Sequence, residues 1–460
     1  MSIGIPWIIS RRRVLIGSSL DFFINIFIYN YVFNKELGSY PSQIVSIGLG
    51  FSWVIISYVL GRYIKISKIT LISFGKAVIK IIFMLIFCNL IYLVINWFVP
   101  LTFYWDTPEF SSYLSRELSN LFIRVSTYIA ITSLFLQYFF SVITYNIYNQ
   151  KKVWIFYGTK TKFNEIMEEI RGLKKDLVLS WHPNQDNLEG INIQTTKGII
   201  IGNLNDINKI NLDTIFKLKL KGVVVEGLLS WFEKEFHRMP TNIIENKNQL
   251  IEKLKSIEDS YQLRTKRIGD LLVSTFLLMI TAPLFILIST LILAEDNGPI
   301  FYTQTRTGRN GDPFKIIKFR SMKIDAEKYG VQWSKARDPR ITCIGKILRA
   351  LRLDELPQLF CVIKGTMSLI GPRPERPEIE NELLKNIPYY NFRNNFLRPG
   401  ISGWAQVNYP YGASISDTQK KLSYDIYYIT HFSILLDLLI FIKTIRLVLN
   451  AKGSLPKKYN

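Results

Sequence analysis

The stretch IGDLLVSTFLLMITAPLFILISTLILA, Ile268–Ala294, decides how this chain is organised. At about 1.5 Å per residue it is long enough to cross a bilayer. Both flanks are basic, with Arg264, Lys266 and Arg267 before it and Arg306, Arg309, Lys315, Lys318 and Arg320 after it. Pro283 removes a backbone donor and clashes with the carbonyl of Met279, so we expect a bend. A re-entrant helix with both ends in the cytoplasm accommodates the bend and obeys the positive-inside rule. An ordinary spanning helix with a mild kink is the alternative.

Four further apolar segments occupy the first 150 residues, each near the ~20 residues of a spanning helix. They are Val14 to Phe33, Ile44 to Leu60, Val78 to Val99 and Leu121 to Thr144. Lysines and arginines gather before the first segment, between the second and third, and after the fourth. The positive-inside rule therefore puts the amino terminus, the loop at 62–77 and everything after 150 in the cytoplasm. We expect no cleavable signal peptide, because the first segment is too long and lacks a small-residue cleavage site.

Composition points to a membrane protein with an anionic partner. The 460 residues are 48% hydrophobic yet carry a formal net charge of +21, which suits anionic lipid or a phosphorylated substrate. Nucleic acid is disfavoured because no groove-reading motif accompanies the charge. Three cysteines and three histidines show neither a disulfide framework nor a zinc-ligand spacing.

Residues 151–262 alternate short apolar runs with amphipathic stretches, which predicts a Rossmann-like α/β domain between a 1–150 transmembrane domain and a 263–460 carboxy-terminal domain. The expected strands are Val153 to Tyr157, Asp176 to Ser180, Gly198 to Ile201 and Gly222 to Val225, with helices at Phe163 to Gly172 and Asp206 to Phe216. The turn after the first strand holds one glycine, Gly158, where a dinucleotide site needs three. We therefore favour a structural or regulatory role for this domain.

Adjacent carboxylates occur in Leu353-Asp354-Glu355-Leu356-Pro357, behind the arginines Arg340, Arg349 and Arg352. Burying either charge is costly unless cations or a divalent ion compensate. Further cations stand in Lys318-Phe319-Arg320-Ser321-Met322, in Gly371-Pro372-Arg373-Pro374 and in the run from Arg398 to Val407. Because guanidinium forks and Mg²⁺ both suit phosphate, this pattern predicts a phosphate site rather than a solvated ion-pair patch.

These motifs, together with Gln304-x-Arg306-x-Gly308, Gly-x-x-Gly-Trp-Ala-Gln ending at Gln406, and Tyr424-Asp425-Ile426-Tyr427-Tyr428, resemble the bacterial polyprenyl-phosphate sugar-1-phosphate transferases, particularly the large exopolysaccharide-priming members. The resemblance covers about Arg264 to Gly453. It implies an α-helical membrane bundle, a Rossmann-like α/β domain and a monotopic α/β phosphoglycosyltransferase domain. Two departures are Ala282, where members commonly have serine before the kink proline, and the missing glycines of the α/β domain.

The resemblance also implies an activity: transfer of a hexose-1-phosphate from a UDP-sugar to undecaprenyl phosphate with release of UMP, on the cytoplasmic face of the bacterial inner membrane. Asp354 would be the nucleophile and Glu355 would hold Mg²⁺. The candidate substrate-binding residues are Lys318, Arg320, Arg349, Arg352, Arg373, Arg398 and Gln406, with Trp404 as a further candidate beside the nucleotide and Asp425 and Tyr428 as weaker ones. UDP-glucose or UDP-galactose is the expected donor, N-acetylhexosamines are the alternative, and a homodimer is compatible with the sequence.

Two other classes of function are open. In a membrane transporter or sensor, the acidic pair would be an ion site and ionisable residues would lie within the bundle, where Asp21 and Arg124 are the candidates. A nucleotide-sugar oxidoreductase would use the α/β domain, against which the missing glycines argue. The apolar run from Phe432 to Asn450 carries Asp437, Lys443 and Arg446 at helical spacing, which predicts an interfacial helix.

Overall fold

The computed structural model describes residues 12–38, 43–60, 62–63, 75, 77–82, 84–86, 108–148, 153–171, 173, 177–183, 195–202, 212–244, 250, 261–326, 338–409 and 414–449. The chain divides into two compact units. Unit 1 comprises Met1–Ile155, Lys174–Ser180 and Leu188–Gly198, and unit 2 comprises Phe156–Leu173, Trp181–Asn187 and Ile199–Asn460. The boundary between them passes through a four-stranded sheet.

Unit 1 contains the long apolar helices α2 (Arg12–Leu37), α3 (Gln43–Val59) and α5 (Pro108–Tyr148). Val14–Glu36 and Leu121–Phe140 are long and apolar enough to cross a membrane, which confirms the first and fourth predicted segments as helices. Val45–Tyr58 and Ala77–Ile86 are shorter apolar helices, and the remainder of the predicted third segment lies outside the described residues. Such apolar helices are those of a membrane protein.

The α/β domain contains a four-stranded sheet of order β2-β1-β3-β4, namely Val178–His182, Val153–Tyr157, Thr196–Ile201 and Val224–Gly227. β1 and β3 run parallel, because the amide of Val153 donates to the carbonyl of Thr195 at one end and that of Gly202 donates to Tyr157 at the other. The helices are α6 (Lys160–Ile170), α8 (Leu212–Leu220) and α9 (Leu228–Phe236).

Sequence patterns located three of the four strands only to within two residues. β2 and β4 begin two residues later than predicted and β3 two residues earlier, while β1 has its predicted bounds. The helix expected at Asp206 to Phe216 is described only from Leu212, and α9 was not predicted. Boundary shifts of this size are ordinary because neighbouring strands, rather than local propensity, decide where pairing begins.

The carboxy-terminal domain begins with α11 (Tyr261–Asp296), which leads into the antiparallel hairpin of β5 (Phe301–Thr307) and β6 (Pro313–Phe319). The remaining elements are α12 (Cys343–Ala350), the 3₁₀ turn η3 (Leu353–Glu355), α13 (Gln358–Lys364), β7 (Ser368–Ile370), α14 (Pro377–Asn386), α15 (Phe392–Asn395), β8 (Gly400–Ser402), α16 (Trp404–Asn408), α17 (Ile415–Thr430) and α18 (Ile434–Leu449). β7 and β8 pair in parallel.

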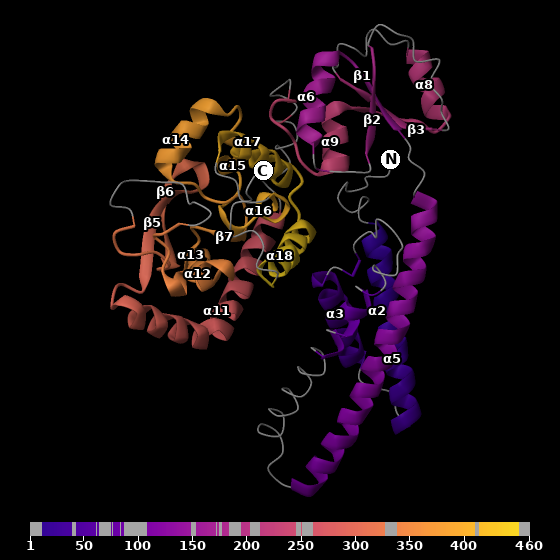
Figure 1. The fold of residues 1–460 in the computed structure, drawn as a ribbon, viewed down its shortest axis with the longest axis vertical. Coiled ribbons are helices and arrows are strands. Elements are labelled where there is room, and N and C mark those ends of the chain that lie inside the picture. Colours follow the sequence, from indigo (N-terminus) through magenta and orange to yellow (C-terminus); the bar gives the residue numbers. More distant parts are fainter. Residues whose placement is uncertain are drawn as a thin grey trace. The chain divides into compact units, whose positions relative to one another are not determined.

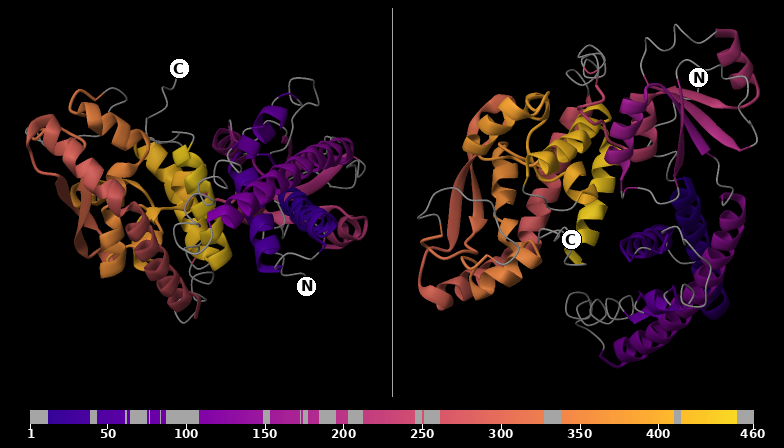
Figure 2. Two further views of the ribbon diagram at one scale, coloured as in Figure 1. Left: turned by 90° about the horizontal axis from the view of Figure 1, so that it is seen from below. Right: turned by 45° about the horizontal axis from the view of Figure 1, so that its top comes forward.

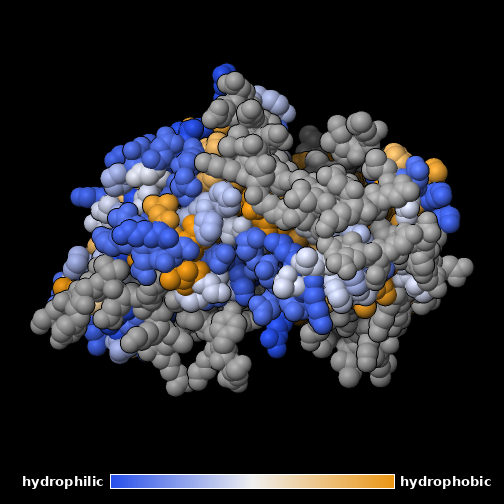
Figure 3. Space-filling model, turned by 90° about the horizontal axis from the view of Figure 1, so that it is seen from above, coloured by the Kyte–Doolittle hydropathy of each residue, from blue (hydrophilic) through white to orange (hydrophobic). Residues whose placement is uncertain are grey.

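The helix α11 is a single 36-residue element with Pro283 inside it. Figure 1 and the right view of Figure 2 show that it turns part-way along its length. Its middle exposes large apolar side chains, among them Leu272, Met279 and Ile286. By contrast, the described surface near α14 and α17 is mainly hydrophilic (Figure 3). This helix therefore gives the domain a strongly apolar face.

Within α18, the charges predicted to face lipid headgroups bond inside the protein. Asp437 accepts a hydrogen bond from Lys266 Nζ at 2.6 Å, and Lys443 Nζ donates to Asn408 Oδ1 at 2.6 Å. Leu435 and Leu438 are exposed instead. These two charged side chains thus bond within the domain, while the apolar side chains of α18 are partly buried, as at Leu436 and Ile440, and partly exposed.

Candidate active site

The acidic pair is placed by the leucines on either side of it. Leu353 and Leu356 pack against a buried cluster in which α11 contributes Ile288 and Ile292. The turn begins at Arg352, which has left-handed backbone dihedrals with φ of 55°. Because the leucines are anchored in the core, Asp354 and Glu355 line a pocket instead.

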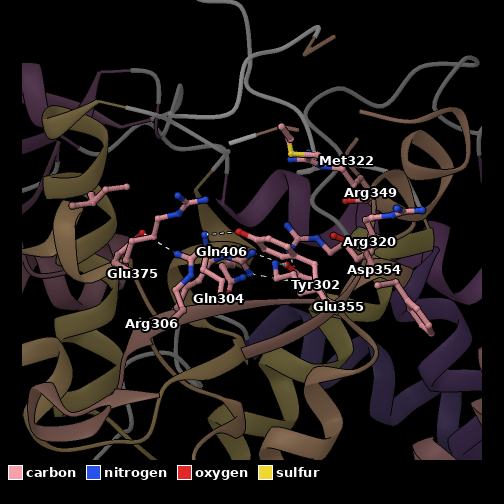
Figure 4. A pocket seen from close by; sticks show the side chains of 18 of the residues that line it. Tyr302, Gln304, Arg306, Arg320, Met322, Arg349, Asp354, Glu355, Glu375 and Gln406 are labelled. Atoms are coloured by element: carbon pink, nitrogen blue, oxygen red, sulfur yellow. Dashed lines mark hydrogen bonds and ion pairs between the residues drawn. The ribbon is translucent and has the colours of Figure 1, made fainter. Parts of the chain in front are cut away.

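This pocket has a volume of about 430 Å³, within the range of small-molecule sites. It brings together most of the predicted site residues: Asp354, Glu355, Lys318, Arg320, Arg349, Arg352, Arg373 and Gln406. Arg320 and Arg349 lie on one side of the acidic pair, and Gln304 and Arg306 on the other (Figure 4). Arg398 is not among the lining residues but borders a second, smaller pocket.

Three cations hold Glu355. Its Oε1 accepts a hydrogen bond from Lys318 Nζ at 3.0 Å and another from Arg373 Nη2 at 2.5 Å. Arg352 Nη1 lies 3.7 Å from Oε2. Burial alone would raise the pKa of Glu355, but Arg373, Lys318 and Arg352 outweigh burial and hold the pKa well below its usual value. Glu355 is therefore ionised throughout the physiological range.

Asp354 is different, because its carboxylate makes no hydrogen bond or ion pair with the described residues. Burial raises its pKa to about 6, with Lys318 opposing and Glu355 reinforcing the rise. At neutral pH the group is mostly ionised. A buried, ionised carboxylate whose oxygens face a cavity is available to act as a nucleophile.

The close approach of β7 and β8 positions Arg373. A Cβ on Gly371 would lie 2.3 Å from the carbonyl oxygen of Arg398, and one on Gly400 would lie 2.0 Å from the Gly371 amide nitrogen. Only glycine fits at these two positions. Arg373 follows this junction by two residues, so the glycines of both motifs set where its guanidinium reaches Glu355.

Three other predicted site residues have hydrogen-bond or ion-pair partners away from the acidic pair. Arg320 lines the pocket but pairs with Asp296 at the end of α11. Gln406 Nε2 donates to the Ile401 carbonyl at 3.3 Å, and its Oε1 is buried with no hydrogen-bond partner in the described chain. Trp404 does not line the pocket; it is buried, and its Nε1 donates to the carbonyl of His237 at 2.9 Å.

One wall of the pocket was not assigned from the sequence. Tyr302, Gln304 and Arg306 alternate along β5 and all line the cavity. Arg306 Nη2 donates to Gln304 Oε1 at 2.7 Å, and Gln304 Nε2 donates to Tyr302 Oη at 2.9 Å. The period-two spacing within the Gln304-x-Arg306 motif is the signal that could have found this wall.

Asp425 also lines the pocket. Burial raises its pKa to about 6 against the opposing charge of Arg393, whose Nη2 lies 3.4 Å away. Tyr428 lies outside the pocket lining, and its hydroxyl donates to Asp437 at 2.6 Å. The two residues of this motif therefore face different surroundings.

The acidic pair fits a magnesium ion that also binds a phosphorylated substrate. In the described part of the chain, no three or more His, Cys, Asp or Glu side chains are close enough together to hold a metal ion by themselves. Magnesium, however, commonly takes one or two carboxylates and completes its shell with substrate phosphates and water. Glu355 Oε2 has its cations at 3.5 Å and 3.7 Å, beyond close hydrogen-bond contact, and Asp354 is open. Both carboxylates can therefore serve as ligands.

Comparison with known proteins identifies the family of this chain. Residues 261–451 match the family model of the bacterial sugar transferases. The exopolysaccharide production protein ExoY of Sinorhizobium fredii is 36% identical over 205 residues, which are 41% of this chain and 88% of that protein. The chain belongs to the bacterial sugar transferase family.

Two further relatives are longer than the Sinorhizobium protein. The UDP-N-acetylgalactosamine-undecaprenyl-phosphate N-acetylgalactosaminephosphotransferase of Aeromonas hydrophila is 45% identical over 189 residues, 41% of this chain and 44% of that protein. The UDP-glucose:undecaprenyl-phosphate glucose-1-phosphate transferase of Klebsiella pneumoniae is 37% identical over 182 residues, 39% of each chain. The matches thus span less than half the length of these two transferases.

In the helical unit, the two ionisable residues considered for a transporter have internal partners. Asp21 is fully buried and accepts hydrogen bonds from the hydroxyls of Tyr63 and Ser133, each at 2.7 Å. Arg62 lies 3.6 Å from it. Arg124 pairs with Glu36 at 3.1 Å on the surface. In this bacterial sugar transferase, both groups contribute to helix packing.

Proposed function

We propose that this protein transfers a sugar-1-phosphate from a UDP-sugar to undecaprenyl phosphate, as the priming step of exopolysaccharide or O-antigen synthesis. The observation that carries the proposal is the division of roles in the acidic pair. Glu355 is held by three cations, whereas Asp354 faces the same pocket with no bonding partner in the described chain. One fixed carboxylate and one open one suit a covalent phosphoryl transfer.

In the first step, a carboxylate oxygen of Asp354 attacks the phosphorus that bears the sugar. The bond from that phosphorus to the bridging oxygen breaks, and UMP leaves with the electron pair. In the second step, a phosphate oxygen of undecaprenyl phosphate attacks the same phosphorus, and the Asp354 carboxylate is released. The products are UMP and the undecaprenyl-diphospho-sugar, and the nucleophile is regenerated.

The cations around the acidic pair can stabilise the negative charge of the phosphates and of the nucleophile during both steps. Lys318, Arg352 and Arg373 surround Glu355 and can bind the phosphates of the donor. Magnesium bound at Glu355 would neutralise the pyrophosphate, which otherwise repels an incoming carboxylate. Arg349 lines the same pocket and lowers the pKa of Asp354, so it stabilises the ionised nucleophile.

The names of the relatives indicate two classes of UDP-sugar donor to compare. The Aeromonas relative is named for UDP-N-acetylgalactosamine at 45% identity, and the Klebsiella relative for UDP-glucose at 37%. Purified protein should be incubated with Mg²⁺, undecaprenyl phosphate and each of UDP-N-acetylgalactosamine, UDP-glucose and UDP-galactose while UMP is measured. Mass spectrometry of protein given the active UDP-sugar alone should find a phosphosugar adduct on Asp354. Turnover with kinetics of a ternary complex and no adduct would exclude the covalent step.

We also propose that α11 is re-entrant and that the catalytic domain lies on the cytoplasmic face of the inner membrane. At its start, Arg267 donates to the carbonyls of Val362 and Ile363, at 2.6 Å and 2.9 Å. Near its end, Glu295 accepts a hydrogen bond from the Cys343 amide at 2.7 Å. Both residues thus bond to one compact domain, although a straight helix would separate them by about 42 Å.

Labelling with a membrane-impermeant thiol reagent tests this topology. Tyr261→Cys and Asp312→Cys put single thiols at exposed sites on either side of the apolar stretch. The background should carry Cys88→Ala, Cys343→Ser and Cys361→Ala, because the native Cys343 is itself exposed. Both new thiols should resist the reagent in intact cells and react after lysis. Labelling of Asp312→Cys from outside would refute the re-entrant placement.

A further inference from the structure

A second pocket lies at the first turn of α11, apart from the acidic pair. Its volume is about 50 Å³, and it shares no lining residue with the larger pocket. Four of its lining residues are cations that come from three places in the chain: Lys266 and Arg267 from α11, Arg309 from the β5–β6 turn, and Arg398 from the segment before β8. The pocket is too small for a nucleotide but comparable to a single phosphate group.

The pocket keeps a net positive charge. Lys266 pairs with Asp437 at 2.6 Å. Asp270, a carboxylate among the lining residues, accepts hydrogen bonds from the Ser368 hydroxyl at 2.7 Å and the Leu369 amide at 3.1 Å. The side chains of Arg309 and Arg398 make no hydrogen bond or ion pair within the described residues.

The arginines are also close enough to repel one another. Burial lowers the pKa of Arg398, the charges of Arg267 and Arg309 lower it further, and the charge of Asp270 opposes this only in part. Holding like charges together is unfavourable unless an anion is bound between them. The pocket is therefore built for an anionic ligand.

Its location identifies the source of that anion. Ile268 follows Arg267 directly and is exposed, as is Leu272, and these residues begin the apolar face of α11. In the proposed topology, the pocket lies where that face meets the headgroup layer. Phospholipid phosphates are the dense anions at that depth, and a guanidinium fork matches them bidentately.

We propose that Arg309 and Arg398, with Arg267, bind the phosphate group of an anionic membrane phospholipid beside the point where α11 enters the bilayer. This site rests on the membrane placement of α11 and not on the transfer reaction. Arg398 then serves as a lipid ligand rather than as a clamp for the UDP-sugar. Bound lipid would fix the start of α11, whose Asp270 already bonds to β7 through Ser368.

Native mass spectrometry of the full-length protein in detergent tests the site, with phosphatidylglycerol and phosphatidylcholine added at equal concentration. The wild type should retain phosphatidylglycerol preferentially. The double variant Arg309→Gln/Arg398→Gln should lower that retention about tenfold or more, since each cation near a membrane contributes roughly 1 kcal/mol. Arg398→Lys should retain part of the preference because it keeps the charge without the fork.

Arg264→Gln is the matched control, because it removes an exposed cation from the same turn of α11 outside the pocket. It should leave the preference unchanged. Equal retention of phosphatidylglycerol by the double variant and the wild type would overturn the proposal. If Arg398 variants misfold, Arg309→Gln alone should still lower the retention. Displacement of the lipid by millimolar inorganic phosphate would assign the site to soluble phosphate instead. Stronger retention of undecaprenyl phosphate than of phosphatidylglycerol would assign it to the acceptor, and either result would overturn the phospholipid assignment.

Discussion

Asp21 in the helical unit and Asp354 in the catalytic domain are both buried carboxylates near arginines, yet their oxygens are used differently. Asp21 accepts bonds from Tyr63 and Ser133 and lies near Arg62, so both its oxygens have internal partners. Asp354 has none in the described chain and opens onto a pocket of about 430 Å³. A satisfied carboxylate stabilises a fold, whereas an unsatisfied one remains available to a ligand.

Asp354→Asn should give the largest effect. An amide lacks both the charge and the nucleophilicity of the carboxylate, so UMP release should fall by about 10⁴-fold or more. Thermal unfolding of the detergent-solubilised protein should be unchanged, because the side chain has no hydrogen bond to lose. A clear drop in unfolding temperature would make Asp354 a structural residue like Asp21.

Asp21→Asn should produce the opposite result. Arg62, with a side chain only 4% exposed, would lose its carboxylate partner, and breaking a buried pair costs about 3–5 kcal/mol. Unfolding temperature should fall while turnover per folded molecule is retained. Glu36→Gln is the matched control: it breaks the exposed pair with Arg124, which should cost less than about 1 kcal/mol. Loss of turnover in folded Asp21→Asn protein would revive the ion-site alternative.

Glu355→Gln should lower activity by less than Asp354→Asn does. Removing the charge takes away a magnesium ligand and frees Lys318 and Arg373, so the rate should fall about 10²-fold and more Mg²⁺ should be needed. A magnesium titration of UMP release measures both effects. Glu375→Gln alters another carboxylate of the same pocket and should leave the titration midpoint in place. An unchanged midpoint in Glu355→Gln would move Glu355 out of the metal shell.

Trp404→Phe should have the smallest effect. It removes the hydrogen bond from Nε1 to the carbonyl of His237, worth about 1 kcal/mol of stability, and keeps an aromatic ring in place. Unfolding temperature should drop slightly and the magnesium midpoint should stay constant. A change in the KM for the UDP-sugar without a change in stability would instead indicate that Trp404 contacts the donor.

Several elements were predictable because their causes are local. β1 has its predicted bounds, and the segments from Val14 and Leu121 are helices, since each depends on a continuous apolar run. The family motifs likewise indicated Lys318, Arg349 and Arg373 as substrate-binding candidates, and all three line the pocket. Trp404, which also stands in a motif, does not line it. Trp404 packs against the segment after α9, an element that the sequence did not predict.

By itself, the sequence determined that the chain contains an apolar helix interrupted by Pro283 and, further on, a cation-rich acidic pair, because composition and covalent geometry act within short windows. Only the tertiary structure decided which carboxylate is held and which is open. Lys318 and Arg373 come from elements 37 and 18 residues away from Glu355, and folding aims both of them at that side chain. The same long-range packing put Arg398 next to Arg309 and Arg267. Electrostatic partners are chosen by distance in space, and local sequence does not encode that distance.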